Sequence, residues 1–351
     1  MSMNKLKHTS EKQENYITQK GGCDSAVLKK KYAVRITDAV KETIQGDIHT
    51  DPVAKQYIPQ ARELTILPQE NIDPIGDDVH TPVKGIVHRY PDRVLFKPAN
   101  ICAVYCRYCF RRERVGPGSD ILSAQERTEA LNYIRQNTQI REVILTGGDP
   151  LVLSPRQLDE IFSALEAIEH VQTIRIHTRI PIADPARVTP ELTAILEERT
   201  KPIYMVVHAN HTQEISKRVQ ECLNTLHKAG CSLLSQSVLL KGVNDSAEIL
   251  EQLFRTLLSA HVKPYYLHHP DLAPGTAHFH LSIAQGKAIM AELQGRLSGV
   301  ALPHYMLDIP GGYGKVPITC SYMTPLPNGK YLVKDPKGGE HLYPPEGENY
   351  E

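Results

Sequence analysis

Residues 101–110 read Ile101-Cys102-Ala103-Val104-Tyr105-Cys106-Arg107-Tyr108-Cys109-Phe110 and contain three of the chain's seven cysteines. Three thiolates at the spacing C-x3-C-x2-C can hold three irons of a 4Fe-4S cube and leave the fourth iron open to a substrate or cofactor. Zinc is the first alternative, but zinc ligands usually combine C-x2-C with a second ligand pair, which the sequence lacks. Inert thiols are the second alternative. The other cysteines are scattered, and we expect them to be buried small side chains: Cys23, Cys222, Cys231 and Cys320.

The cysteine stretch lies in a region that alternates short β-rich runs with amphipathic helices. Helices are predicted to begin at Ser123, Ser154 and Ser282, because each serine is followed three residues later by Glu or Gln, as in a capping box. Repeated strand, helix, strand units predict parallel strands, in either a doubly wound sheet or a full or partial barrel. This pattern alone does not separate the two. The predicted strands are residues 93–97, 142–146, 173–178, 203–208, 233–240 and 263–268.

Polar residues gather where these strands end, which is where α/β proteins place their sites. The cysteines follow the first strand, and Gly147-Gly148-Asp149 follows the second. Further polar side chains follow or lie in the later strands: His177, Arg179, His208, Asn210, Gln236, His268 and Asp271. The sequence therefore predicts one site at the carboxyl ends of the strands.

Length and composition exclude several classes of protein. The chain has 351 residues, which favours one large domain with appendages. Lys plus Arg (40) equals Asp plus Glu (40), so the basic excess typical of nucleic-acid binding is missing. No apolar run approaches the ~20 residues that span a bilayer, and the N-terminus has no apolar segment of a secretory signal. We expect a cytoplasmic protein that binds neither nucleic acid nor membrane.

A second motif, Asp308-Ile309-Pro310-Gly311-Gly312-Tyr313-Gly314-Lys315, displays a lysine on a glycine-rich loop. It is not a Walker A phosphate loop, because the glycine spacing differs and Val316 follows the lysine. A loop lysine can form a Schiff base with pyridoxal 5′-phosphate (PLP). Without further context, a solvated lysine on a flexible loop is the alternative.

The cysteine motif together with the Gly-Gly-Asp turn resembles the radical S-adenosylmethionine (radical SAM) superfamily. The resemblance implies that S-adenosyl-L-methionine binds the open iron and is cleaved to a 5′-deoxyadenosyl radical. It also implies that Tyr108 lies along the adenine and that Gly147, Gly148 and Asp149 meet the methionine amino end. With the lysine loop included, residues from His88 to about 320 resemble the lysine 2,3-aminomutase family.

This family resemblance implies a fold and a reaction. The fold is α/β, a partial (β/α)6 TIM-like barrel of the radical SAM type over residues 86–300. A helical region (1–85) precedes it, and a closing PLP-lysine segment (301–351) follows. The implied reaction moves the α-amino group of L-lysine to the β-carbon, with reduced flavodoxin or ferredoxin as the electron donor.

The resemblance also implies residue roles. Lys315 holds PLP, and Arg111 binds the substrate carboxylate in a bidentate pair, for which guanidinium is suited. Asp271 and Asp308 bind the distal ammonium of lysine. Arg89 and Arg93 lie near PLP, and Gln236 lies near the adenosyl cofactor. We expect Arg112 and Arg114 to be solvated charges or partners in helix pairs.

Two departures from the family pattern leave alternatives open. Ser246 stands where longer members have a zinc-binding cysteine, and no cysteine follows Cys320, so we predict no zinc; a homo-oligomer stays compatible with the sequence. Residues 106–112 and 181–189 resemble the subgroup that supplies β-lysine to elongation factor P, but Asp271 and Asp308 favour free L-lysine. The remaining alternatives are an aminomutase for glutamate or another amino acid, and a zinc-stabilised anion-binding module.

Overall fold

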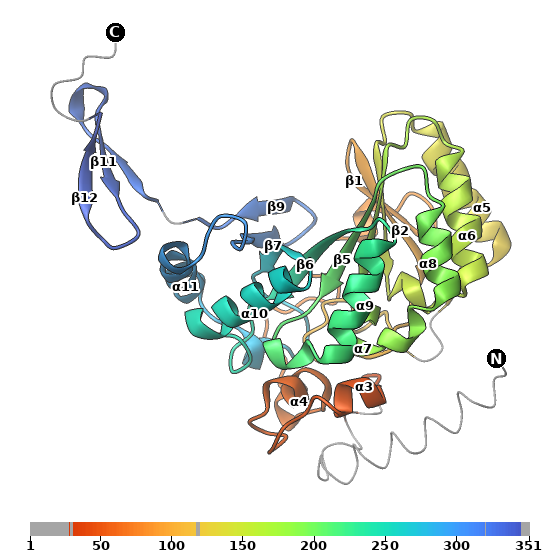
Figure 1. The fold of residues 1–351 in the computed structure, drawn as a ribbon, viewed down its shortest axis with the longest axis horizontal. Helices are drawn as coiled ribbons and strands as arrows, with labels where there is room; N and C mark the ends of the chain where they lie inside the picture. The colour runs from red at the N-terminus through yellow and green to blue at the C-terminus, as the bar shows by residue number, and fades with distance from the viewer. Residues whose placement is uncertain (1–27, 29–30, 117–119, 320, 345–351) are drawn as a thin grey trace.

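The computed structural model describes Leu28 and residues 31–116, 120–319 and 321–344. Within these residues the core is one curved nine-stranded sheet, nearly closed into a barrel, whose strand order follows the chain from β1 to β9 (Figure 1). A doubly wound sheet would reverse its order part-way. The partial barrel is therefore confirmed. The strands are β1 (Ile86–Tyr90), β2 (Arg93–Ala99), β3 (Glu142–Gly147), β4 (Thr173–Thr178), β5 (Ile203–His208), β6 (Ser232–Val238), β7 (Lys263–His268), β8 (His304–Ile309) and β9 (Gly314–Pro317).

Each of the six predicted strands is present, as β2 to β7, and all six are parallel. The sheet contains a seventh parallel strand, β8, and an antiparallel strand at each edge, β1 and β9. Sequence patterning missed these three because β1 and β8 mix polar with apolar residues and β9 has only four residues. A separate antiparallel sheet projects from the body near the C-terminus: β10 (Met323–Pro325), β11 (Tyr331–Lys334) and β12 (Glu340–Tyr343).

Helices cover the outer face of the barrel. The predicted capping boxes at Ser123, Ser154 and Ser282 are all formed. In α6 the side chains at helical spacing, including Ile161 and Phe162, are buried against the sheet, which explains why this segment is an amphipathic helix. The helices on this layer are α5 (Ala124–Gln136), α6 (Pro155–Glu166), α8 (Pro190–Glu197), α9 (Lys217–Lys228), α10 (Ala247–Ser259) and α11 (Ile283–Arg296). The 3-10 turns are η1 (Ala61–Leu64), η2 (Asp78–His80), η3 (Pro150–Val152), η4 (Pro185–Arg187), η5 (Thr212–Glu214), η6 (Ala277–Phe279) and η7 (Pro327–Gly329).

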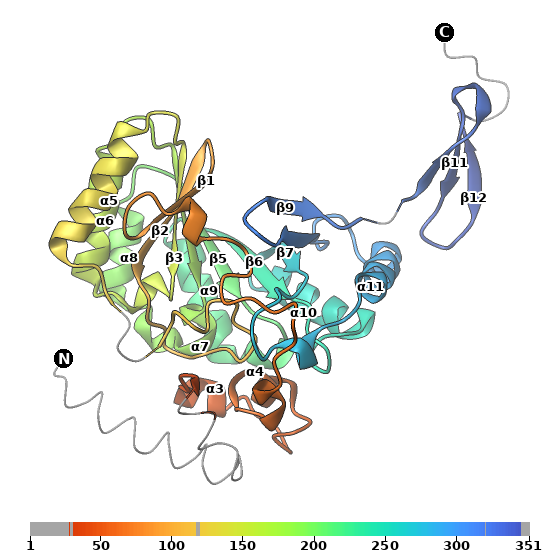
Figure 2. The same ribbon diagram turned by 180° about the vertical axis from the view of Figure 1, so that it is seen from behind.

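The N-terminal segment packs at the carboxyl ends of the strands. Its short helices α3 (Asp38–Lys41) and α4 (Pro52–Tyr57) lie beside α7 (Ile180–Ala183), which follows β4 (Figure 2). The segment also holds the cysteine loop, because Tyr105 N–H donates to the Arg35 carbonyl and Arg107 N–H donates to the Gln56 carbonyl. The N-terminal segment, which is distant in the chain, therefore packs over the predicted site.

The expectation for Arg112 was wrong. Arg112 and Arg107 are buried, and both guanidinium groups bind the fully buried carboxylate of Glu63. The Arg112 guanidinium also lies 3.6 Å from the centre of the Tyr32 ring. The local sequence resembles an exposed basic run, but a carboxylate far away in the chain neutralises it. Arg114, by contrast, is partly exposed and pairs with Asp78.

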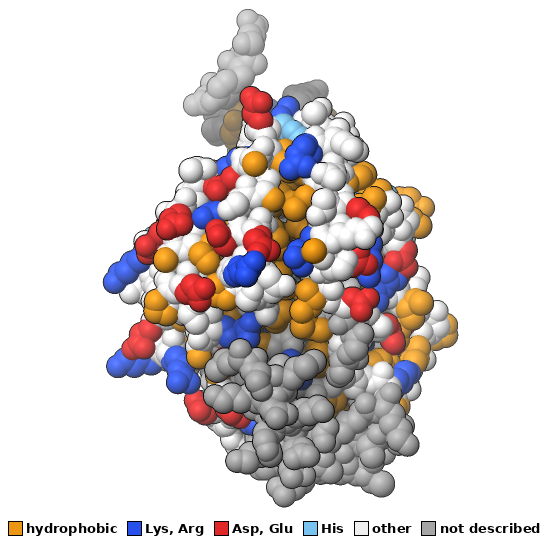
Figure 3. Space-filling model, turned by 90° about the vertical axis from the view of Figure 1, so that its right-hand side faces the viewer, with side chains coloured by type: hydrophobic (Ala, Val, Ile, Leu, Met, Phe, Trp, Pro, Cys, Tyr) orange, Lys and Arg blue, Asp and Glu red, His pale blue; other side chains and the backbone are white. Residues whose placement is uncertain are grey.

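Two of the four scattered cysteines are buried, as the sequence predicted. Cys222 and Cys231 are buried, whereas Cys23 and Cys320 lie outside the described residues. On the face shown in Figure 3, basic and acidic side chains are interspersed and neither sign forms a continuous patch. Among the described helices, none has the length and apolar character needed to cross a membrane.

Candidate active site

A cavity of about 360 Å³ opens at the carboxyl ends of the strands. Every site residue singled out from the sequence lines it, although these residues come from positions 89 to 315 of the chain. The barrel therefore brings the two sequence motifs to one place. The lining includes Arg89, Arg93, Cys102, Cys106, Tyr108, Cys109, Arg111, Gly147, Gly148, Asp149, Gln236, Asp271, Asp308 and Lys315.

The three clustered cysteines occupy the loop that follows β2. Burial, followed by the charges of neighbouring groups, raises the pKa of the Cys102 thiol, and burial raises that of Cys109 to about 11. Across the described residues, no three Cys, His, Asp or Glu side chains converge as ligands of a single metal ion do. Three thiols on one loop facing a shared cavity fit a polynuclear iron cluster, in which each thiolate binds a different iron.

The turn Gly147-Gly148-Asp149 packs against the strand that leads into the cysteine loop. A Cβ on Gly148 would lie 2.2 Å from the Ile101 carbonyl oxygen, and Asp149 N–H donates to that same oxygen over 2.9 Å. Gly147 has a φ of +114°. The glycines thus allow backbone to approach backbone, and this contact fixes the cysteine loop relative to β3.

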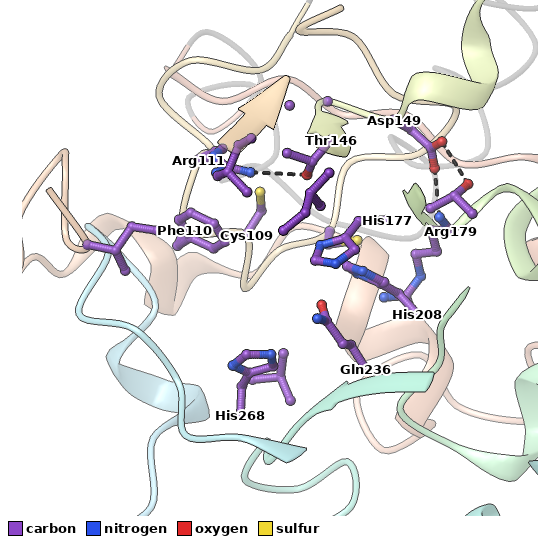
Figure 4. A pocket seen from close by; sticks show the side chains of 18 of the residues that line it. Cys109, Phe110, Arg111, Thr146, Asp149, His177, Arg179, His208, Gln236 and His268 are labelled. Atoms are coloured by element: carbon purple, nitrogen blue, oxygen red, sulfur yellow. Dashed lines mark hydrogen bonds between the residues drawn. The ribbon is translucent and has the colours of Figure 1, made fainter. Parts of the chain in front are cut away.

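Asp149 uses its carboxylate to connect neighbouring strand ends. It accepts hydrogen bonds from the Thr178 hydroxyl and from the Arg179 backbone N–H, each over 2.7 Å, and from Leu151 N–H over 3.1 Å (Figure 4). Burial raises the pKa of Asp149 despite these bonds. The carboxylate therefore orders the junction of β3 and β4 beside the cysteines.

Tyr108 is anchored by a buried polar network that sequence reasoning missed. Its hydroxyl accepts hydrogen bonds from Asn210 Nδ2 over 2.7 Å and from the Arg179 guanidinium. Arg179 pairs in turn with Glu214, and Gln56 Oε1 accepts from both Arg179 and Asn210. Polar strand ends gave a signal for Arg179 and Asn210, but Gln56 and Glu214 had no sequence signal.

Cations gather beside the cysteines around one carboxylate, Asp77, that the sequence did not indicate. Asp77 Oδ2 accepts from Arg111 Nε and Nη2 over 3.1 and 2.8 Å, and Oδ1 accepts from Arg89 Nη2 over 3.1 Å. Burial alone would raise the pKa of Asp77, but its cationic neighbours, Arg111 foremost, lower it. Arg111 Nη1 also donates a long hydrogen bond, of 3.5 Å, to Thr146 Oγ1. Arg89 Nε is buried and has no hydrogen-bond partner in the described structure.

Two carboxylates, Asp271 and Asp308, also line the cavity. Asp308 and Lys315 face each other across the β8–β9 ladder, which explains why their side chains form an ion pair. His268 Nδ1 lies 3.6 Å from the Asp308 carboxylate. Burial, followed by the charge of Asp308, raises the pKa of Asp271 to about 7. For Asp308, His268 and Lys315 outweigh burial and lower the pKa.

Two histidines whose pKa is lowered also line the cavity. His177 at the end of β4 and His208 at the end of β5 have ring centroids 6.0 Å apart, and in Figure 4 they lie between Arg111 and Gln236. Burial lowers the pKa of both, to about 3 for His208. Both Nε2 atoms are buried and lack a hydrogen-bond partner among the described residues. They can therefore donate or accept hydrogen bonds toward a ligand without adding charge.

The cysteine loop and the barrel define the class of the protein. The sequence profile of the Radical SAM superfamily matches residues 96–253, which run from within β2 through the cysteines and β3 to β6 into α10. Radical SAM chemistry implies a 4Fe-4S cluster and S-adenosylmethionine, and the three loop thiols with an open cavity beside them fit that requirement.

Sequence similarity to known enzymes shows to which family within the Radical SAM superfamily the chain belongs. The chain is 41% identical over 288 residues to the L-lysine 2,3-aminomutase of Methanococcus maripaludis, covering 82% of this chain and 66% of that one. It is 37% identical over 309 residues to the L-lysine 2,3-aminomutase of Clostridium subterminale, covering 88% and 74%. It is also 39% identical over 273 residues to the glutamate 2,3-aminomutase of Clostridioides difficile, covering 78% and 64%. The chain belongs to the lysine 2,3-aminomutase family, and the protein is an enzyme.

Proposed function

We propose that this enzyme is a radical SAM, PLP-dependent aminomutase that converts L-lysine to β-lysine. The observation that carries the proposal is a single cavity lined by three loop thiols, a loop lysine, an arginine and two aspartates. Each group matches one requirement of the reaction: radical generation, amine chemistry, carboxylate binding and binding of a distal cation.

The chain's own residues fit both cofactors. Cys102, Cys106 and Cys109 would hold the iron-sulfur cluster beside S-adenosylmethionine, and their bonds to iron require loss of the thiol protons. Lys315 would hold PLP, and the unpartnered Nε of Arg89 supports binding of an anion such as its phosphate. PLP supplies an electron sink for chemistry at an amino-bearing carbon.

The distribution of charge favours lysine over glutamate. Arg111 and Arg89 together carry one more positive charge than their shared partner Asp77 can neutralise, which suits the α-carboxylate of the substrate. Asp271 and Asp308 also line the cavity, and beside them the second carboxylate of glutamate would be repelled. Asp308 now pairs with Lys315, so covalent use of the Lys315 amine would free this carboxylate for a substrate ammonium group.

Turnover of the anaerobically purified enzyme tests the proposal. Reduced enzyme would be incubated with S-adenosylmethionine, PLP and either L-lysine or L-glutamate, with NMR detection of the β-amino acid. We expect β-lysine, about four irons per chain and little zinc. A colourless protein with stoichiometric zinc, or turnover of glutamate alone, would contradict the proposal.

A substitution in the acidic side of the cavity separates the two substrates. Asp308→Asn should abolish lysine turnover while iron content and PLP absorbance persist. If the enzyme instead acts on glutamate, the same variant should retain activity. Free β-lysine is the expected product whether it is used as such or supplied to elongation factor P, so this assay tests the reaction and not the later use of its product.

A further inference from the structure

The barrel is open between its two edge strands, and the side chain of Tyr90 reaches across the opening. In the described residues no backbone ladder joins β1 to β9. Instead, the backbone N–H of Lys315 on β9 donates a hydrogen bond of 2.8 Å to the hydroxyl of Tyr90, the last residue of β1. These two residues are separated by 225 positions in the chain.

The geometry of β9 explains why this amide needs a partner. Lys315 lies opposite Asp308 in the β8–β9 ladder, and its side chain points to that carboxylate. Its N–H bonds to Tyr90 and so faces away from β8, on the free edge of the sheet. A backbone N–H on the free edge of a sheet has no partner in the ladder and must bond water or another group. Tyr90 therefore satisfies the one backbone donor of the residue that carries the amine.

The Tyr90 ring is itself held in place from its other side. The guanidinium carbon of Arg93 lies 3.8 Å from the ring centre, within range of a cation–π contact. The hydroxyl also fits closely against the glycine before the lysine, because a Cβ on Gly314 would lie 2.8 Å from Tyr90 Oη. Gly314 has a φ of +95°, which glycine tolerates. Close packing against Tyr90 and the positive φ together explain why the third glycine of the motif, Gly314, is a glycine.

We propose that Tyr90 is a positioning residue that fixes the backbone of Lys315 and thereby directs its amine into the cavity. This inference rests on the proposed role of Lys315 in holding PLP. Tyr90 lines the cavity but acts through Lys315, so its loss should loosen the lysine while leaving the cysteine loop and the substrate aspartates intact.

Tyr90→Phe tests the proposal, because it removes the hydroxyl and keeps the ring. Tyr133→Phe is a matched control: the Tyr133 hydroxyl bonds His88 of the same strand over 2.8 Å and does not touch Lys315. In ligand-free protein, we expect faster amide hydrogen exchange at Lys315 in Tyr90→Phe only. With PLP added, we expect about a 2- to 12-fold weaker PLP affinity, the range of one hydrogen bond, and slower borohydride trapping at Lys315.

The two readouts separate failure of this inference from failure of the proposed function. Wild-type-like exchange at Lys315 and wild-type-like PLP affinity in Tyr90→Phe would overturn the role of Tyr90. Equal effects in Tyr133→Phe would also overturn it, since a general loosening of β1 would then suffice. If the wild-type protein forms no trapped adduct at Lys315, the proposed function fails, while the exchange comparison still decides whether Tyr90 fixes this backbone.

A double-mutant cycle with Gly314→Ala tests the contact from its other side. Next to Tyr90 the added methyl would meet the hydroxyl oxygen at 2.8 Å, but next to Phe its nearest ring carbon would be at 3.4 Å. We therefore expect Gly314→Ala to accelerate exchange at Lys315 less in the Phe background than in the wild type. Strictly additive effects would show that the two residues act independently, contrary to the proposal.

Discussion

The substitution Asp271→Asn should stabilise the ligand-free enzyme at pH 8 while impairing it as a catalyst. Asp271 lines the cavity near Asp308, and burial followed by that second charge raises its pKa to about 7. An unfolded aspartate has a pKa of about 3.9. Between these values the folded chain holds a proton that the unfolded chain has lost, so stability falls as pH rises from about 4 to about 7. Asparagine, which is always neutral, removes this loss.

The magnitude follows from the shift. At about 1.4 kcal/mol per pKa unit, three units correspond to about 4 kcal/mol. Part of this belongs to the interaction with Asp308, whose own pKa shifts in the opposite direction, so we expect about 1–2 kcal/mol at pH 8 and little at pH 4.5. For lysine, loss of one charged hydrogen-bond partner costs about 1.5–3 kcal/mol, or about 10- to 150-fold in kcat/KM.

Thermal unfolding of the ligand-free protein at the two pH values, together with lysine turnover at pH 8, measures both effects. Asp159→Asn is the control, because Asp159 lies on α6 at the outer surface, in an ion pair with Arg199. It should change neither the pH dependence nor turnover. If Asp271→Asn destabilises the enzyme equally at both pH values, or if lysine turnover is unchanged, the assigned environment and role of Asp271 are wrong.

Three further substitutions probe contacts around the site. Glu63→Gln should destabilise the fold by about 3–5 kcal/mol in chemical denaturation, because it leaves two buried guanidinium groups without their carboxylate. Gly148→Ala should lower iron content after reconstitution, since its methyl would lie 2.2 Å from a carbonyl oxygen of the cysteine loop; Gly299→Ala, with open space around its Cβ, should not. Asp77→Asn should raise the KM for lysine more than it lowers kcat, because Arg111 loses the partner of its Nε and Nη2 groups.

Local patterns explain what the sequence could predict. The six central strands are short β-rich runs between helices with capping boxes, and each element is determined by residues close together in the chain. The thiol spacing of Cys102, Cys106 and Cys109 is equally local. The resemblance then allowed Lys315, Arg111 and the two aspartates to be named before the barrel placed them in one cavity.

The sequence could not predict the roles of Asp77 and Glu63, because their partners lie far away in the chain. Asp77 and Arg111 are 34 positions apart, and Glu63 and Arg107 are 44 positions apart. Nothing in the residues around Asp77 or Glu63 distinguishes them from exposed acidic side chains. The prediction for Arg112 was wrong for the same reason. A run of basic residues is typical of an exposed surface, and the sequence around it does not show that Glu63 packs against it.

The N-terminal segment therefore belongs physically to the site, although the predicted domain boundary at residue 85 separates the two in the chain. Seven parallel strands with helices outside leave the carboxyl ends of the strands uncovered. The N-terminal segment packs over this end and supplies two carboxylates to it. Glu63 forms ion pairs with Arg107 and Arg112, and Asp77 forms ion pairs with Arg89 and Arg111. If this segment kept its place but lost Glu63 and Asp77, four arginines, two of them buried, would lack these carboxylate partners. One uncompensated buried charge costs several kcal/mol, comparable to the whole stability of a domain. The acidic residues Glu63 and Asp77 thus permit a dense cluster of arginines beside the cysteine loop.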